Sequence, residues 1–395
     1  MIKLNRLLLI FAVALLAACA GTPEENDPAE LTDFVIEREL IKLWSARVGD
    51  GQGKGLYQLR PAIEGDTLYV ASADGQLQAR ATSDGDIRWE KELELTVSGG
   101  VGIDYERLYL GTTEGVVIAF NLKGEELWRT QLSGEVLAPP VSDEEIVVAQ
   151  TYDGQLVGLD ALSGEKLWAF SASVPRLTLR GTSTPLLDGP LVFAGLANGR
   201  VVALDKSTGA LRWEQRISVP KGSTEIERLS DVDGELLLDG GVLYAAGYQG
   251  TLTAIDVRSG RALWQRDLSS YSGPVEGYGN IYVADADGSI HAFEQNGQGV
   301  IWTQTILARR KLSAPAILSG SLVVGDFEGY LHFVSQVDGH LVSRVQLDDS
   351  GVRAPMVSAD DKLFVFSNEG QLAAYSFDRD TTVTRHRNFG PKQRR

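Results

Sequence analysis

The chain has 395 residues, of which 43% are apolar and 43 are glycines, and its formal net charge is −16. Such an acidic balance argues against a nucleic-acid-binding surface, which is basic and clustered. The apolar content is enough for a large core, and the glycine content is typical of a chain with many turns and few helices.

The first residues, 1–18, have the pattern of a secretory signal peptide. Lys3 and Arg6 precede an apolar run that is too short to span a bilayer. The small residues before Cys19, in "LLAAC", resemble the lipobox of bacterial lipoproteins. This resemblance implies cleavage before Cys19 and acylation of that residue by chains such as palmitate. Because Ala20 follows instead of aspartate, it also implies the outer membrane.

Residues 19–35 are expected to be an acylated cysteine followed by a flexible tether. The stretch "AGTPEENDPAELTD" (20–33) is acidic, contains two prolines and offers too little apolar surface to order itself. We expect the acyl chains to hold the folded part at the periplasmic face of the outer membrane, while the tether leaves it free to turn.

An internal repeat occupies residues 36–378. It indicates a single domain built from repeats, although the length by itself would suggest two or three domains. Each unit contains two short runs rich in β-branched and aromatic residues around a tight turn, as in "LYVASADGQLQAR". Glycine accepts the positive φ that such turns require. The turn glycines recur about every 40 residues, the spacing of propeller blades, at Gly75, Gly115, Gly154, Gly199, Gly250, Gly288, Gly329 and Gly370.

A tryptophan follows six of these glycines at a nearly constant distance: Trp89, Trp128, Trp168, Trp213, Trp264 and Trp302. The seventh unit has Ser343 there, and we expect this departure to loosen the seventh blade. A further apolar segment precedes each next unit, which gives four strands per repeat. The sequence therefore predicts an all-β fold, an eight-bladed β-propeller with tryptophan-docking-type repeats.

The eighth unit, "SNEGQLAAYSFD" (367–378), lacks an outer strand, because only the basic stretch 379–395 follows it. Trp44 has the opposite deficiency, since no hairpin precedes it. We therefore predict that residues 36–48 complete the last blade and close the ring, so that no sheet edge is bare at the joint. The alternative is that 380–389 supplies the strand. Otherwise the basic tail is expected to be a solvated terminus, with contact to anionic lipid or an acidic partner as the alternative.

Catalytic and metal-binding patterns are not found. The four histidines, His291, His332, His340 and His386, have no metal-ligand spacing. The stretch "DADGS" (285–289) lacks the later ligands of a calcium loop, and "GDGQGKG" (49–55) lacks the spacing of a phosphate-binding loop. We predict no catalytic residue, no metal and no cofactor. Acid–base chemistry at the axis, where distant blades meet, is left open.

The tryptophan that follows "SG" or "TG", as in "SGEKLW" (163–168), resembles the docking motif of quinoprotein dehydrogenases. Those enzymes are eight-bladed propellers that hold pyrroloquinoline quinone and calcium, so a periplasmic dehydrogenase is one alternative. Many of them place a pair of neighbouring cysteines over the quinone, and this chain has only Cys19. We therefore expect the chain not to be an enzyme.

A closer resemblance covers almost the whole chain, through the lipobox, the acidic tether, the eight units and the stretches "LTLRGTSTP" (177–185) and "GSTEIERLSDVD" (222–233). The chain is similar to the BamB family, lipoproteins of the outer-membrane β-barrel assembly (BAM) complex. That family lacks enzymatic activity. The resemblance implies a scaffold that binds the POTRA domains of BamA and assists the insertion of barrel proteins. It leaves open whether unfolded outer-membrane proteins are contacted directly.

By motif, the resemblance implies that the BamA-binding residues are Leu177, Leu179, Arg180, Asp231 and Asp233. Two apolar side chains beside a guanidinium suit an interface anchor, and the carboxylates would orient the arginine or meet a basic group of the partner. The two longest repeat intervals fall at these stretches, where a rigid scaffold commonly carries its binding surface. The alternatives are loops that are merely longer, and a lipoprotein that binds polysaccharide or peptidoglycan.

Overall fold

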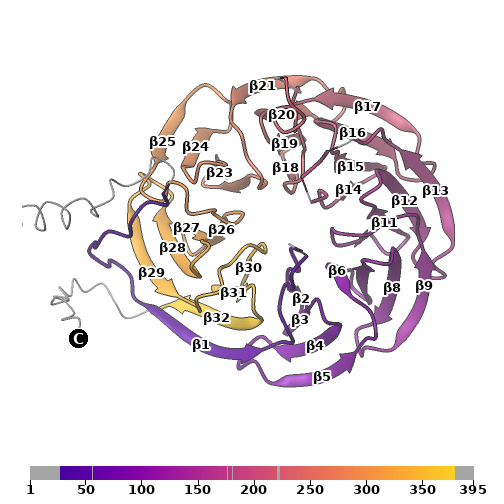
Figure 1. Cartoon of the computed structure of the whole chain (residues 1–395), viewed down its shortest axis with the longest axis horizontal. Coiled ribbons are helices and arrows are strands. Elements are labelled where there is room, and N and C mark those ends of the chain that lie inside the picture. The colour runs from indigo at the N-terminus through magenta and orange to yellow at the C-terminus, as the bar shows by residue number, and fades with distance from the viewer. Residues whose placement is uncertain (1–26, 56, 176, 180, 220–222, 379–395) are drawn as a thin grey trace, which may run out of the picture.

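The computed structural model describes residues 27–378 except 56, 176, 180 and 220–222. Within these residues, 32 strands form eight antiparallel sheets of four strands each. Figure 1 shows the sheets arranged as blades around a central axis. The eight-bladed β-propeller predicted from the sequence is confirmed. The expectations for the signal peptide, Cys19, Arg180 and the basic tail concern residues outside the described part of the chain.

Each blade has an innermost strand at the axis, two middle strands and an outer strand. In that order, blades one to four contain β2 (Ala62–Glu64), β3 (Thr67–Ala71), β4 (Gln76–Ala81) and β5 (Ile87–Glu92); β6 (Val97–Ile103), β7 (Arg107–Thr112), β8 (Val116–Asn121) and β9 (Glu126–Gln131); β10 (Val141–Ser142), β11 (Ile146–Gln150), β12 (Gln155–Asp160) and β13 (Lys166–Ser171); β14 (Leu186–Asp188), β15 (Leu191–Gly195), β16 (Arg200–Asp205) and β17 (Leu211–Arg216). Blades five to eight contain β18 (Leu237–Asp239), β19 (Val242–Ala246), β20 (Thr251–Asp256) and β21 (Ala262–Asp267); β22 (Val275–Gly277), β23 (Asn280–Ala284), β24 (Ile290–Glu294) and β25 (Val300–Gln304); β26 (Ala316–Leu318), β27 (Ser321–Gly325), β28 (Tyr330–Ser335) and β29 (Leu341–Gln346); β30 (Val357–Ala359), β31 (Lys362–Phe366), β32 (Gln371–Phe377) and β1 (Leu40–Arg47).

The hydrophobic core lies between neighbouring blades. The two middle strands of a blade carry apolar runs that are buried on both faces, and every residue of β7 is buried. The outer strands alternate between exposed and partly buried residues, as in β5. One cluster joins Leu77 of blade one to Leu108 and Leu110 of blade two. Each sheet is therefore stabilised by its two neighbours, which makes the ring one cooperative unit.

In every blade except the seventh, a tryptophan links the blade to the next one. In blade one, the Trp89 ring packs on Tyr69 with a centroid distance of 6.0 Å. Its Nε1 donates a hydrogen bond to the carbonyl of Leu122 in blade two at 2.9 Å. A β-carbon at Gly124, in the same turn of blade two, would lie 2.9 Å from the ring. Glycine is required there because the indole lies directly on the turn.

The ring closes through the first strand. Strand β1 pairs antiparallel with β32, and the sheet has the order β1-β32-β31-β30. Trp44 of β1 packs on Phe364 of blade eight, and its Nε1 donates to the carbonyl of Thr82 in blade one at 3.2 Å. Residues 40–47 thus lie where the sequence placed the missing outer strand (Figure 1).

The seventh blade, in which Ser343 replaces the tryptophan, does not have a gap at that position. Ser343 is buried, and Phe333 on the neighbouring strand lies directly opposite it. Phe377 meets Phe333 edge to face at 5.4 Å, and the Arg38 guanidinium lies 3.6 Å from the centre of the Phe377 ring. The expected loosening is therefore offset, because other large side chains fill the space.

Residues 27–39, which we call the strap, lie along the outside of the seventh blade. The Ala29 amide donates to the Ala308 carbonyl at 2.9 Å, and the Glu37 amide donates to the Val342 carbonyl at 3.0 Å. Leu31 and Phe34 pack against the apolar cluster between blades six and seven. Residues 27–35, expected as part of a free tether, are thus held against the propeller, because two apolar side chains find a hydrophobic surface there.

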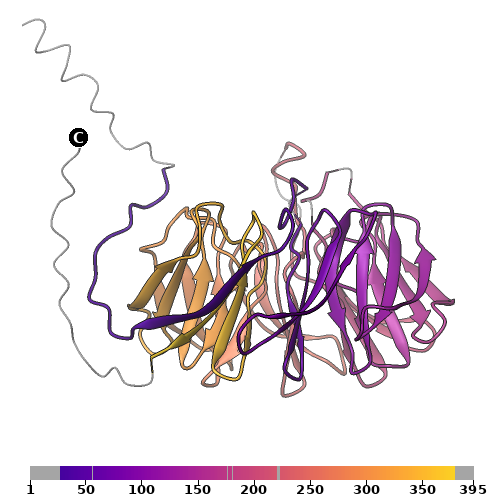
Figure 2. The same cartoon turned by 90° about the horizontal axis from the view of Figure 1, so that it is seen from below.

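The turns and connections emerge at two opposite faces of the ring. The connection from the outer strand of each blade to the next blade, such as 172–185, lies at the same face as the turn between the two middle strands. We call this the loop face; Figure 2 shows connections that rise above it. Within the described residues, no helix has the length and apolar character needed to cross a membrane.

Candidate binding face

Two long connections meet on the loop face. Connection 172–185 joins β13 to β14, and connection 217–236 joins β17 to β18. The amide of Leu179 donates a hydrogen bond to Oδ2 of Asp231. A second link runs from Oγ of Ser183 to the carbonyl of Gly234, at 3.0 Å. The stretches 177–185 and 222–233, distant in the sequence, therefore form one surface between blades three and five.

The predicted site residues divide into an outward and an inward group. The Leu177 side chain points to solvent and is 42% exposed, and Leu179 is half-buried. Asp231 is only 1% exposed, below the 177–181 segment, and Asp233 is partly buried. Asp231 is thus a positioning residue for the loop and does not present its carboxylate at the surface.

The carboxyl groups under the loop have perturbed acidities. Burial raises the pKa of Asp231 to about 6, although the hydrogen bond from the Leu179 amide acts to lower it. Burial, together with the charge of Asp231, raises the pKa of Asp233 well above its ordinary value. A β-carbon at Gly181 would lie 2.9 Å from Oδ2 of Asp233. The loop therefore packs closely against two carboxyl groups whose pKa values are both raised.

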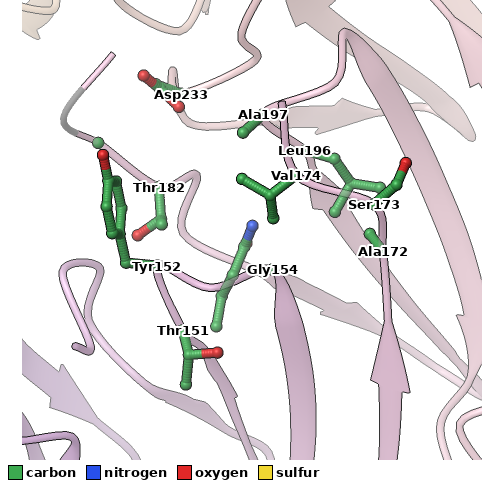
Figure 3. Close-up of a pocket in the computed structure, with 12 residues that line it drawn as sticks. Thr151, Tyr152, Gly154, Ala172, Ser173, Val174, Thr182, Leu196, Ala197 and Asp233 are labelled. Atoms are coloured by element: carbon green, nitrogen blue, oxygen red, sulfur yellow. The ribbon is translucent and has the colours of Figure 1, made fainter. Parts of the chain in front are cut away.

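Neighbouring hairpin turns also support the loop, a contribution that the sequence motifs did not predict. The Tyr152 hydroxyl and Oγ1 of Thr178 are hydrogen-bonded at 3.0 Å, and Nδ2 of Asn198 donates to the Ser173 carbonyl at 3.1 Å. A small cavity lies beneath, and Figure 3 shows Tyr152, Thr182 and Val174 around it. One sequence feature could have identified Tyr152 as a supporting residue. It is an aromatic residue at a hairpin-turn position where four of the other units have alanine or threonine.

The axis of the ring forms a second candidate site. A cavity of about 490 Å³ is lined by the innermost strands, chiefly by apolar residues such as Ile63, Ile103 and Leu187. Nη1 of Arg60 lies 2.6 Å from Oε1 of Glu235, so an ion pair joins blade one to blade five across the axis. Among the described residues, no group of three His, Cys, Asp or Glu side chains is placed to hold a metal ion.

Comparisons with known proteins agree over most of the chain. The family model described as outer membrane protein assembly factor BamB matches residues 36–96, 92–304 and 286–388. An outer membrane protein assembly factor BamB of Pseudomonas aeruginosa is 47% identical over 370 residues, which cover 93% of this chain and 97% of that protein. The one of Escherichia coli is 35% identical, with 95% of this chain and 100% of that protein covered.

Solved structures show the same fold. BamB from Moraxella catarrhalis has a TM-score of 0.79 at 30% identity and covers 86% of this chain and 100% of that one. A quinohemoprotein alcohol dehydrogenase from Comamonas testosteroni has a TM-score of 0.67 at 13% identity, covering 86% and 76%. That second likeness concerns the fold alone. On the family match and the identities to full-length relatives, the chain belongs to the BamB family of outer membrane protein assembly factors.

Proposed function

We propose that this chain is a non-enzymatic scaffold lipoprotein, anchored through acylated Cys19 at the periplasmic face of the outer membrane. It binds the POTRA domains of BamA with its loop face and thereby assists the assembly and insertion of β-barrel proteins. Relatives named outer membrane protein assembly factors support the assembly role. The observation that carries the binding face is the hydrogen bond from the Leu179 amide to the buried carboxylate of Asp231.

This contact fixes an exposed apolar segment before any partner arrives. Leu177 extends into solvent from a loop that Asp231, Tyr152 and Thr178 hold from below. A loop that is ordered in advance loses less conformational entropy on binding, so more of its contact energy contributes to affinity. An apolar side chain on a rigid support can bury its surface against a partner at little entropic cost. The arginine at position 180 is of a residue type that is enriched among interface anchors.

A matched pair of leucines tests this assignment. Leu177→Ala should weaken binding of purified POTRA domains at least about tenfold in calorimetry, since central anchors dominate interface energies. Leu167→Ala is the control, because Leu167 on the outer strand β13 is 52% exposed and lies away from the loop face. Equal affinity of the two variants, with unchanged melting temperatures, would overturn the assigned face.

The second candidate function is a quinoprotein-type dehydrogenase, the alternative that the tryptophan-docking motif of the sequence leaves open. Its cofactor would occupy the axial cavity, where the ion pair of Arg60 and Glu235 spans the ring. Addition of pyrroloquinoline quinone and calcium, followed by a dye-linked assay of alcohol oxidation, separates the two functions. Sustained turnover would establish the dehydrogenase, and we expect none.

A further inference from the structure

Exposed apolar side chains on the loop face are concentrated on one side of the ring. Five of them lie in the three successive connections that follow β13, β17 and β21, while blade seven contributes only Phe327 among the described residues. We call these five residues the apolar arc: Val174, Leu177, Val219, Ile226 and Tyr271. The arc begins at the candidate binding face and continues past it toward blade six.

Tyr271 forms the far end of the arc and is rigidly supported. Its ring stacks on Tyr248 with centroids 4.6 Å apart and planes at 19°. Tyr248 lies in the turn between β19 and β20, and its carbonyl accepts a hydrogen bond from Oγ of Ser218 at 2.8 Å. Even so, Tyr271 is 48% exposed, because the stack covers only part of the ring. Exposed tyrosines are common on protein surfaces, but Tyr271 differs in that it belongs to a group of exposed apolar side chains on one face, and such groups mark interaction sites.

This end of the arc is joined to the candidate binding face through the backbone. The Tyr248 amide donates to the carbonyl of Asp231 at 2.9 Å, and the Asp231 side chain accepts from the Leu179 amide. Leu177 and Tyr271 are therefore held by the same short chain of contacts. Ile226, which is strongly exposed, lies in the connection between them.

We infer that Tyr271, together with Ile226, is a second anchor for the same folded domain that Leu177 binds. This inference rests on the proposed function, which makes that domain a POTRA domain of BamA. A stable interface involves roughly 20–30 residues on each partner, many more than the five residues of segment 177–181. The apolar arc adds exposed apolar side chains from three successive connections of the same face. Aromatic residues such as Tyr271 are among the side chains that most often carry binding energy.

The opposite face offers matched control residues. Tyr105, in the turn between β6 and β7, and Tyr278, in the turn between β22 and β23, are both more exposed than Tyr271. Because these turns join the innermost strand of a blade to the second strand, they lie on the face away from the arc. Alanine at either position removes an exposed tyrosine without touching the proposed surface.

The first test measures binding of purified POTRA domains to the mature protein by calorimetry. Tyr271→Ala should weaken binding about 10- to 30-fold, as loss of an aromatic anchor does. Tyr271→Phe should bind nearly as well as the parent, since the stacked ring remains, and Tyr105→Ala and Tyr278→Ala should bind equally well. If Leu177→Ala weakens binding and Tyr271→Ala does not, the second anchor is wrong while the proposed function stands. If the parent protein does not bind POTRA domains, both are wrong.

The second test does not depend on the stability of a weakened variant. The chain has one cysteine, so Tyr271→Cys in a Cys19→Ser background carries a single thiol. Maleimide labelling of that thiol should slow several-fold when POTRA domains are added, and labelling of Tyr105→Cys in the same background should not change. Unchanged labelling at position 271 overturns the inference. Protection by an unfolded barrel protein, but not by POTRA domains, also overturns it, since the occupant would be a different polypeptide.

Discussion

In each blade, the residue at the tryptophan position of the outer strand and the residue opposite it on the adjacent strand are matched in size. Trp89 lies directly opposite Ala79, and Trp168 lies opposite Gly158. A β-carbon at Gly158 would lie 2.3 Å from the Trp168 ring, so the small residue is required by the indole. In blade seven the sizes are exchanged, because Ser343 faces Phe333. In the other blades the indole docks on the turn before the outer strand of the next blade. Blade eight has no such turn, because its outer strand β1 comes from the other end of the propeller sequence.

This exchange predicts a non-additive pair of substitutions. Ser343→Trp should destabilise the protein by about 1–3 kcal/mol, because the new indole overlaps the Phe333 ring in a packed core. Adding Phe333→Ala should recover part of that loss, since it recreates the pair found in the other blades. Urea unfolding of the two single variants and the double variant measures the coupling. Strict additivity would show that the two side chains do not share one space.

The strap is held to the propeller by hydrogen bonds that its own composition does not indicate. Two arginines, one in the connection from β25 to β26 and one in β29, donate to the strap backbone. Nη1 of Arg310 donates to the Ala29 carbonyl at 3.0 Å, and Nη1 of Arg344 donates to the Thr32 carbonyl at 3.1 Å. Behind them lies a buried network, in which Nε of Arg310 bonds Asp326 and Nε of Arg344 donates to Nδ1 of His332. The strap is therefore attached to charged groups in the blade interior.

His332 should make this attachment sensitive to pH. Its Nδ1 accepts a hydrogen bond from Nε of Arg344 and its Nε2 lies 2.8 Å from Asp326, so the neutral form with hydrogen on Nε2 fits both contacts. Burial lowers the pKa of His332, although the contact with Asp326 acts the other way. The unfolded chain, in which the histidine pKa is about 6.5, therefore binds this proton at a higher pH than the folded state does, and stability is lost as the pH falls below about 7.

His332→Gln tests that expectation, because the amide keeps one donor and one acceptor but does not titrate. Its melting temperature should fall less than that of the parent between pH 7.5 and 5.5. His340→Gln is the control, and it should change the pH dependence of the melting temperature in the opposite direction. Burial acts to lower the pKa of His340, but its contacts with Glu37 and Asp338 outweigh this and raise the pKa. Loss of His340 should therefore steepen the acid destabilisation. Parallel curves for all three proteins would contradict the role of His332.

The parts of the structure that were predictable from the sequence are those with a local or periodic signal. Each turn glycine with the tryptophan that follows it, such as Gly75 with Trp89, marks one blade. Trp44, which has no hairpin before it, indicates the closing strand. The burial of Asp231 has no such signal, because it depends on a connection about fifty residues away in the chain. Strap docking was not predictable for the same reason: the acidic composition of 20–33 says nothing of the arginines that receive it.

At the scale of the whole ring, the strap and the binding face lie on opposite sides (Figure 1). The strap begins at the loop face, where Nε of Arg309 donates to the Asp27 carbonyl at 2.6 Å, and it ends at the opposite face, where Glu37 pairs with His340. Residue 27 therefore leaves the propeller on the same face as the apolar arc. If Cys19 is acylated, the chain between it and Asp27 spans at most about 28 Å, which keeps the loop face close to the membrane.

Releasing the strap should therefore weaken capture of the partner only at a membrane. The double substitution Leu31→Ser and Phe34→Ser removes the two apolar contacts of the strap. The free segment between Cys19 and the propeller should then extend to Leu40, where β1 begins, instead of ending at Asp27. Effective concentration falls with roughly the −3/2 power of linker length, which predicts about fourfold weaker capture of POTRA domains attached to the same vesicle. Affinity in solution should not change, because the strap is remote from Leu177 and Tyr271.

Paired measurements on vesicles and in solution separate the possible outcomes. Leu127→Ser with Leu167→Ser, two exposed leucines on outer strands, is the matched control and should leave both affinities unchanged. A loss of affinity in solution equal to that on vesicles would show that the strap shapes the binding face itself. Unchanged capture on vesicles, with the strap shown to be released by faster proteolysis within 27–39, would show that the strap does not set the distance between the loop face and the membrane.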